Sequence, residues 1–314
     1  MLFSKSKQLK KAVINYFNYV KETIAFMQLD EETALSINTK LKEGSELIEK
    51  NKFKLAFEIL STELVEQYII LDRVGIQKVR EIIKFSRLNK KWEYDLRRIH
   101  SQGYVMGSWR LEDAEPIAKE NKYTFYKPSL AITSQLQKGN LVKLTFVFDS
   151  DNDEHPRGER MWVKVTEVST DHFKGELDNH PFYLHELYAG DTIQFEHKHI
   201  IDHDLDIHEP NLVDQYINRC FVTSKVLYEY KEVNYLYIDE SIEIDEDKHY
   251  EDSGWRIFVG DETDEYVNDP ENIHFVSLGA VLKRDDSFIH LLEAPIGATY
   301  ERDENGVFVM VEEK

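Results

Sequence analysis

The residues best suited to chemistry lie in the last third of the chain, where Trp255 and Arg256 stand among acidic side chains. Trp and Arg are the residue types most enriched at protein-binding hot spots, and acidic groups on the loop that follows would complement a basic partner. This combination predicts a surface that recognises another protein rather than a catalytic centre. The predicted partner-binding residues are Asp252, Trp255, Arg256, Asp261, Glu262, Asp264 and Glu265.

The two central residues of this segment also have a structural interpretation. Trp255 would then pack in the core of its domain, and Arg256 would pair with Asp261 or Glu262 within the same domain. The nearby glycines need only provide turns in that case. The sequence leaves both interpretations open.

A second set of candidate ligands lies between residues 197 and 209, where histidines alternate with acidic residues. Such side chains could bind a metal ion, and two histidines two residues apart would project from one face of a strand. The spacing fits no familiar zinc pattern, however, and the acidic stretch has the composition of a solvated linker. We therefore predict no metal and no cofactor. The alternative metal ligands are His197, His199 and His203.

Signatures of the common enzyme classes are missing from the sequence. It has no Gly-rich phosphate loop, no GxSxG nucleophile elbow and no HExxH zinc motif. Cys220 opens an apolar strand, so an inert buried thiol is predicted rather than a nucleophile. We predict a protein that is not an enzyme.

The first hundred residues have the pattern of a helical domain. Apolar residues recur at helical spacing from Leu9 onward, Asp30 before two glutamates is a plausible helix start, and no proline interrupts the stretch. Breaks are expected near Asn51 and at Gly75. Residues 1–100 are therefore predicted to form a helical domain.

The period changes to two after residue 136, where Val142, Leu144 and Phe146 alternate with other residues. This alternation predicts strands with one buried face, and tight turns with Gly-Asn and Gly-Asp directly precede two of these strands. Residues 101–205, with a short helix over 111–121, are predicted to form a mostly β domain, a small antiparallel barrel-like fold.

Residues 206–314 are predicted to form an acidic α+β domain in which Asn305-Gly306 makes a hairpin turn. The complete chain is thus expected to be an α+β multidomain protein. Its predicted strands cover 220–222, 233–238 and 255–259, and its predicted helices cover 278–282 and 288–292.

Charge is spread unevenly along the 314 residues, whose net charge is −20. Residues 1–100 hold 19 Lys and Arg against 14 Asp and Glu, whereas residues 220–314 hold 8 against 24. So acidic a surface repels nucleic acid and membranes and attracts basic proteins, although it can also serve solubility alone. The single cysteine suits a reducing cytoplasm, and neither a signal peptide nor a membrane span is expected.

The C-terminal segment resembles a known bacterial family. The first motif that carries the resemblance is Asp252-Ser253-Gly254-Trp255-Arg256. About residues 219–312 resemble immunity protein family 33, formerly domain of unknown function 2185. Its members are assigned as immunity proteins of polymorphic toxin systems, which implies an inhibitory binding role. Further motifs that carry it lie at residues 260–262, 264–266, 268, 291–297 and 300–302.

The middle segment, about residues 120–202, resembles domain of unknown function 2314. The matching motifs lie at residues 159–165, 173–179 and 187–191. That family has no established chemistry, so the resemblance adds an expectation of fold and little about mechanism. The two families often occur together, which supports treating them as one functional unit.

The function expected from these observations is that of a cytoplasmic immunity protein that neutralises a toxin by direct binding and occlusion. If the toxin is a nuclease, its basic groove would explain the acidity of this chain. The first alternative is a small-molecule-binding or housekeeping protein, and the second is a metal-dependent hydrolase that uses the histidine region. The identity of the toxin, the contacting domain, the role of residues 1–100 and the oligomeric state are not specified by the sequence.

Overall fold

The computed structural model describes residues 2–100, 109–150, 154–170, 172–239 and 251–311. The chain divides into two compact units. One comprises Met1–Glu112 with Leu136–His199, and the other comprises Asp113–Gln135 with Ile200–Lys314.

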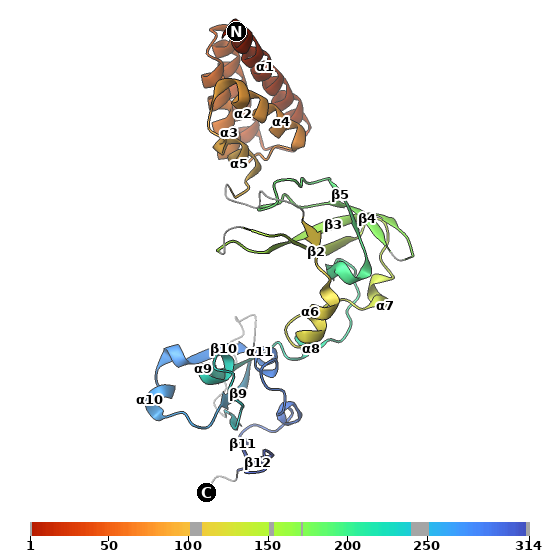
Figure 1. Ribbon diagram of the computed structural model, residues 1–314, viewed down its shortest axis with the longest axis vertical. Coiled ribbons are helices and arrows are strands. Elements are labelled where there is room, and N and C mark those ends of the chain that lie inside the picture. Colours follow the sequence, from red (N-terminus) through yellow and green to blue (C-terminus); the bar gives the residue numbers. More distant parts are fainter. Residues whose placement is uncertain (1, 101–108, 151–153, 171, 240–250, 312–314) are drawn as a thin grey trace. The chain divides into compact units, whose positions relative to one another are not determined.

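The first unit begins with helices packed around one apolar core (Figure 1). Val13, Tyr16, Phe57 and Ile76 are fully buried in it because they lie on the apolar stripes of their helices. This confirms the helical prediction for the N-terminal region. The helices are α1 (Leu2–Phe26), α2 (Glu31–Glu49), α3 (Phe53–Glu66), α4 (Arg73–Ser86) and α5 (Lys91–Arg97).

The predicted helix boundaries are partly right. Asp30 caps α2 by accepting a hydrogen bond from the Thr33 backbone amide, and Asn51 takes a φ of 59° in the turn between α2 and α3. The predicted break at Gly75 is wrong, because Gly75 lies in the first turn of α4, where the Asp72 carboxylate caps it. A glycine is needed there for packing: an added Cβ would lie 2.6 Å from the ring of Tyr19.

An antiparallel half-barrel sheet completes the first unit, with strand order β1-β2-β3-β4-β5. Leu144, Phe146, Met161 and Val163 are buried at alternate positions of β2 and β3, as the period-two pattern predicts. The strands are β1 (Arg110–Leu111), β2 (Leu141–Val147), β3 (Gly158–Val168), β4 (Phe173–Leu177) and β5 (Thr192–Phe195), and the 3₁₀ turn η1 (His197–His199) follows them.

The second unit contains a mixed sheet of order β10-β7-β9-β8-β11-β12, in which β7 and β9 are parallel and the other pairs antiparallel. Cys220, Leu236 and Ile257 bury one face of this sheet against Val281 of α11 and Phe288. The strands of this sheet are β7 (Arg219–Thr223), β8 (Tyr235–Ile238), β9 (Asp252–Phe258), β10 (Ile273–Ser277), β11 (Thr299–Arg302) and β12 (Phe308–Met310). The second unit also contains β6 (Ile200–His203), which is not part of this sheet. The helices of the second unit are α6 (Ala114–Glu120), α7 (Leu130–Thr133), α8 (Leu212–Gln215), α9 (Ser224–Leu227), α10 (Asp264–Val267) and α11 (Leu278–Leu282), and its 3₁₀ turns are η2 (Pro270–Asn272) and η3 (Ile289–Leu291).

The predicted fold class, an α+β multidomain protein, is confirmed. The hairpin turn is also confirmed, because Gly306 has a φ of +79° between β11 and β12. The helix expected over 111–121 begins later, at Ala114, and the one expected over 288–292 is the short turn η3. The domain boundaries at 100 and 205 stay a prediction.

Within the described part of the chain, no helix has the length and apolar character required to cross a membrane.

Candidate partner-binding site

The candidate site starts at β9, whose course is interrupted by a bulge. Gly254 has a φ of +82°, and the register against β7 shifts between Arg219 and Phe221. Only glycine adopts such a φ readily, so the bulge requires the residue found there. Beyond it, successive side chains alternate strictly, with Trp255 and Ile257 on the core face and Arg256 and Phe258 on the other.

Trp255 lies in the core of the second unit, with 2% of its surface exposed. This position agrees with the structural interpretation of the residue. Trp255 nevertheless lines a pocket of about 490 Å³, together with Ser253 and residues of α8 and η3. A role of Trp255 in partner binding stays a prediction, and in this structure it would act through that pocket.

Arg256 pairs with two carboxylates, but not with those suggested by the sequence. Its guanidinium donates two hydrogen bonds to Asp252, at 3.0 and 2.9 Å, and lies 3.2 Å from the Asp239 carboxylate rather than near Asp261 or Glu262. Partial burial opposes the charge on Arg256, but the hydrogen bonds and charges of Asp252 and Asp239 outweigh it and raise the pKa of the guanidinium. Asp252 and Arg256 are thus brought together as a bidentate pair on the strand surface.

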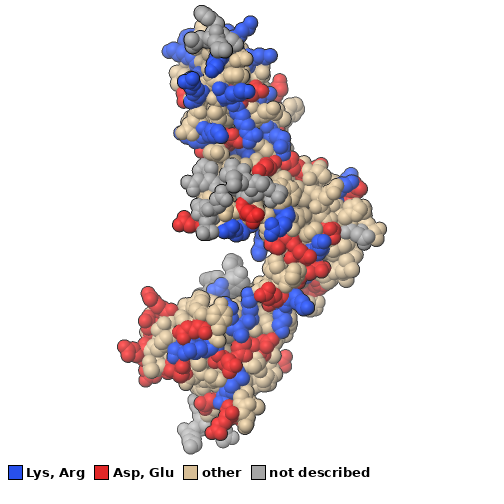
Figure 2. Space-filling view, viewed as in Figure 1, with Lys and Arg blue, Asp and Glu red and all other residues tan. Residues whose placement is uncertain are grey.

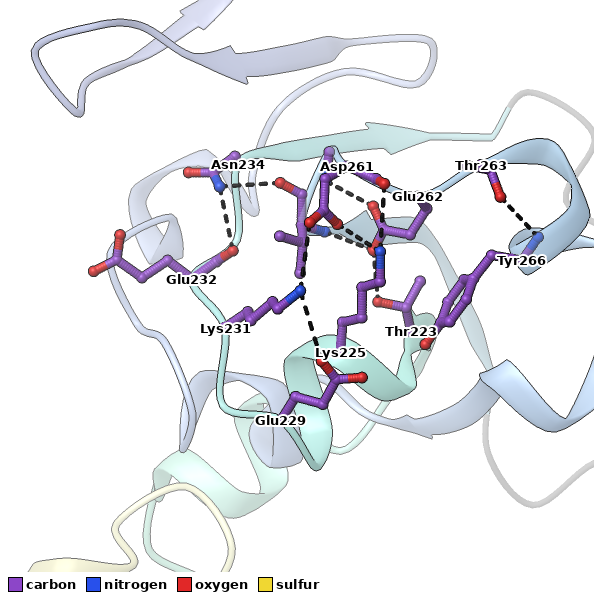
Figure 3. A network of polar contacts seen from close by, with 12 residues as sticks. Thr223, Lys225, Glu229, Lys231, Glu232, Asn234, Asp261, Glu262, Thr263 and Tyr266 are labelled. Carbon is purple, nitrogen blue, oxygen red and sulfur yellow. Dashed lines mark hydrogen bonds and ion pairs between the residues drawn. The ribbon is translucent and has the colours of Figure 1, made fainter.

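Glu262 organises the loop that follows β9 (Figure 3). Its carboxylate accepts hydrogen bonds from the backbone amides of Val259 and Gly260, at 2.9 and 2.7 Å, and from the hydroxyl of Thr223, at 2.8 Å. All the strong contacts of this carboxylate are therefore made inside the domain. We call residues 259–265, which follow β9 and contain four acidic residues, the acidic loop. The position of Glu262 predicts a supporting role for it at the base of this loop.

Asp261, the preceding residue of this loop, is bound by two lysines (Figure 3). Lys225 lies 2.7 Å and Lys231 3.4 Å from its carboxylate. The hydrogen bond from Lys225 is the main cause that holds the pKa of Asp261 below its ordinary value. The charge of Asp261 is therefore largely compensated within the unit.

Asp264 and Glu265 occupy the first turn of α10, which begins at the capping residue Thr263. Both side chains are exposed, and among the described residues neither forms an ion pair. Carboxylates in such a position offer their full charge to solvent or to a partner. Of the seven predicted residues, Asp261, Asp264 and Glu265 are exposed, and Asp261 alone of these three is bound by lysines.

The other face of the mixed sheet is aromatic, a feature that the sequence analysis missed. The rings of Phe221 and Phe275 lie 4.8 Å apart, Arg256 lies over Phe221 at 4.7 Å, and Tyr237 stacks on Phe258 at 6.0 Å. All five residues are half-buried. Their period-two spacing within each strand could have indicated that they share a face of their own strand. Spacing alone does not show which strands pair, and it is strand pairing that brings these side chains together.

The structure does not place His197 and His199 on one face of a strand. His197 and His199 lie in the turn η1, where the ring of His197 contacts Phe173 and His199 accepts a hydrogen bond from the Glu196 amide. His203 lies in β6 and accepts one from the Leu205 amide. Among the described residues, no three His, Cys, Asp or Glu side chains are grouped as metal ligands.

Cys220 is fully buried in β7, and burial raises the pKa of its thiol. The predicted burial of Cys220 is confirmed, and the raised pKa keeps its thiol protonated at neutral pH.

The second unit is therefore an α+β domain with an acidic loop beside an aromatic sheet face. Residues 220–312 match the family model of the Immunity protein Imm33 domain, and residues 111–211 match that of the Uncharacterized protein conserved in bacteria (DUF2314). The chain thus carries an Imm33 domain preceded by a DUF2314 domain, as the two resemblances predicted. No curated protein and no solved structure matches the chain.

Proposed function

We propose that this chain is an immunity protein that binds a basic toxin in the cytoplasm and covers its active or substrate-binding surface. The observation that carries the proposal is the match of residues 220–312 to the Imm33 domain. An immunity domain needs no catalytic group of its own, because inhibition by occlusion requires only a stable complex.

The charge of the matched domain supports a basic partner. Residues 220–314 hold 24 acidic residues against 8 basic ones. On the face shown in Figure 2, Asp and Glu gather over the C-terminal unit, whereas Lys and Arg are dense over the N-terminal helices. A basic groove that binds nucleic acid would be attracted to the acidic region and not to the helices.

The exposed carboxylates and the aromatic face suggest that the interface with the toxin has a charged edge and an apolar centre. Asp264 and Glu265 would meet basic side chains at the edge of the interface, where charge mainly raises the association rate. Tyr237, Phe258 and the Arg256 pair would supply the rigid apolar centre, because large aromatic and Arg side chains dominate binding energies. Asp261 and Glu262 would hold the loop between these two areas.

The test is native capture at low salt from the host, followed by a high-salt wash and identification of the eluted proteins. A basic toxin released by salt supports the proposal, and its coexpression should then be lethal without this chain and tolerated with it. Recovery of the chain alone from cells that express the neighbouring genes, or failure to rescue such cells, contradicts it.

A charge-reversed variant locates the contact. Asp264→Lys/Glu265→Lys should weaken capture by at least roughly tenfold, because two favourable charge contacts become repulsive. Glu46→Lys/Glu49→Lys is the matched control, since it changes the net charge equally on the exposed surface of α2. Equal loss in both variants would place the contact outside the acidic loop.

Small-molecule binding is the second candidate function, and the pocket beside Ser253 and Trp255 favours it. Its volume of about 490 Å³ lies in the range of ligand sites. Salt separates the two functions, because a neutral ligand would bind about equally at low and high ionic strength, whereas a charge-steered protein complex would not.

A further inference from the structure

The mixed sheet of the second unit ends at β12, whose outer edge has no neighbouring strand among the described residues. On its inner side the Val311 amide donates to the Thr299 carbonyl at 2.9 Å, and the Val307 carbonyl accepts from the residue that follows β11. In an antiparallel ladder, residues bonded to the neighbouring strand alternate with residues whose amide and carbonyl point away from it. Phe308 and Met310 therefore direct their backbone N–H and C=O groups to the outer edge.

Arg302 fixes the hairpin of β11 and β12 to the rest of the domain. Its guanidinium lies 4.5 Å from the centre of the Phe308 ring and donates to the Val233 carbonyl at 3.0 Å and the Ser287 hydroxyl at 2.7 Å. Its backbone amide donates to the Asn234 carbonyl on the β8 side, which leaves the alternate residues of β11 to bond with β12. The outer edge is thus held in an extended conformation before any partner binds.

Apolar side chains are exposed along this edge. Val307, Val309 and Met310 are 58%, 46% and 57% exposed, and Val311 is exposed as well. Natural sheets protect open edges with short strands, lysines, prolines or bulges, and β12 is short but contains none of the other three devices. An added strand would satisfy the outward N–H and C=O groups and cover these side chains.

The exposed valines continue the aromatic face of the sheet. Glu301 of β11 lies directly opposite Tyr235 of β8 on one side and Val309 of β12 on the other. The ring of Tyr235 in turn lies 5.9 Å from that of Tyr237. Residues directly opposite one another in paired strands project from the same face, so a strand added to β12 would extend the aromatic surface.

Charge distinguishes a second copy of the chain from another protein as the occupant of this edge. Glu301 and Glu304 are exposed and form no ion pair among the described residues. Symmetric pairing of two β12 strands would bring together two domains that each hold 24 acidic residues against 8 basic ones at 220–314. An extended segment that carries Lys or Arg instead meets these carboxylates with opposite charge.

We propose that β12 binds an extended segment of a basic partner as an additional strand, in which apolar residues alternate with Lys or Arg. Phe308 and Met310 form the main-chain hydrogen bonds, and the basic side chains meet Glu301. The identification of this partner as a toxin rests on the proposed function, whereas the edge itself can be tested without the toxin.

Two synthetic peptides, Lys-Val-Lys-Val-Lys-Val and Glu-Val-Glu-Val-Glu-Val, test the edge on the full chain by NMR with isotope-labelled methionine. The basic peptide should shift the Met310 amide resonance and slow the exchange of this amide with solvent, because the amide gains an acceptor. The Met161 resonance, from a buried residue of β3, should stay unchanged. No change at Met310, or equal binding of the acidic peptide, overturns the proposal.

Variants of Met310 separate main-chain pairing from side-chain contact. Met310→Pro removes the outward donor without breaking a bond to β11, so it should weaken peptide binding roughly tenfold and leave the thermal unfolding midpoint nearly unchanged. Met310→Ala keeps the donor and should retain most of the affinity. Fluorescence anisotropy of the labelled peptide measures both. Unchanged affinity in Met310→Pro, or an equal loss in Met310→Ala, overturns strand addition.

A charge variant tests the predicted contact with Glu301. Glu301→Lys should weaken binding of the basic peptide and strengthen binding of the acidic one, because the attraction becomes repulsion. Glu271→Lys is the matched control, since it makes the same charge change at an exposed position beside β10, the opposite edge of the sheet. Equal effects of the two variants would remove Glu301 from the proposal.

The outcome also distinguishes this proposal from the proposed function. Peptide binding at Met310 without capture of any toxin contradicts the toxin-binding function and leaves the edge as a strand-binding site. Capture of a toxin that Met310→Pro does not weaken supports that function and overturns the use of β12. A concentration-dependent dimer in analytical ultracentrifugation, abolished by Met310→Pro, would assign the edge to a second copy and likewise overturn the proposal.

Discussion

At the scale of single residues, the acidic side chains near β9 make different contacts although they look alike in sequence. Asp252 binds Arg256, Asp261 binds two lysines, Glu262 binds backbone amides, and Asp264 is open to solvent. A carboxylate that completes internal hydrogen bonds cannot also offer its full charge to a partner. The seven predicted residues are therefore separated by their contacts into supporting and accessible groups.

Glu262 gives the first prediction at this scale. Glu262→Ala leaves two backbone amides and the Thr223 hydroxyl without their acceptor, which should cost about 1–3 kcal/mol locally. Hydrogen exchange of the Val259 and Gly260 amides should accelerate strongly. Glu265→Ala is the control, since this exposed side chain has no such contacts and surface changes of this kind cost little. Unchanged exchange at both amides would contradict the supporting role.

At the scale of elements, the bulge in β9 determines which face each later side chain takes. Gly254→Ala places an L-residue at a φ of +82°, which should cost about 1–2 kcal/mol and disturb the pairing of β9 with β7. Hydrogen exchange should rise along the whole of β9. Gly306→Ala, at a φ of +79° in the terminal hairpin, carries similar strain and should raise exchange only near β11 and β12. A Gly254→Ala protein that exchanges like the unmodified chain would show that the bulge has no such role.

These elements also show what could be predicted from the sequence. Local periodicity was sufficient for α1 to α5 and for the alternating strands, because burial of one face follows directly from spacing. The partners of Arg256 could not be predicted, since they depend on the pairing of β8 with β9 and on a bulge that one glycine permits. The aromatic face likewise combines residues that are distant in the chain, and only tertiary structure brings them together.

At the scale of the whole molecule, the separation of charge along the chain makes the salt dependence of partner binding informative. If the acidic loop steers the encounter, the association rate with the captured partner should fall steeply as ionic strength rises, while the dissociation rate changes little. Asp264→Lys/Glu265→Lys should then flatten this dependence, and Glu46→Lys/Glu49→Lys should leave it unaltered. Stopped-flow or surface-binding kinetics over a salt series measures both rates. If the two variants flattened the dependence equally, net charge alone would steer binding, because a local field falls off within roughly 10 Å at ordinary salt and distinguishes one surface from another.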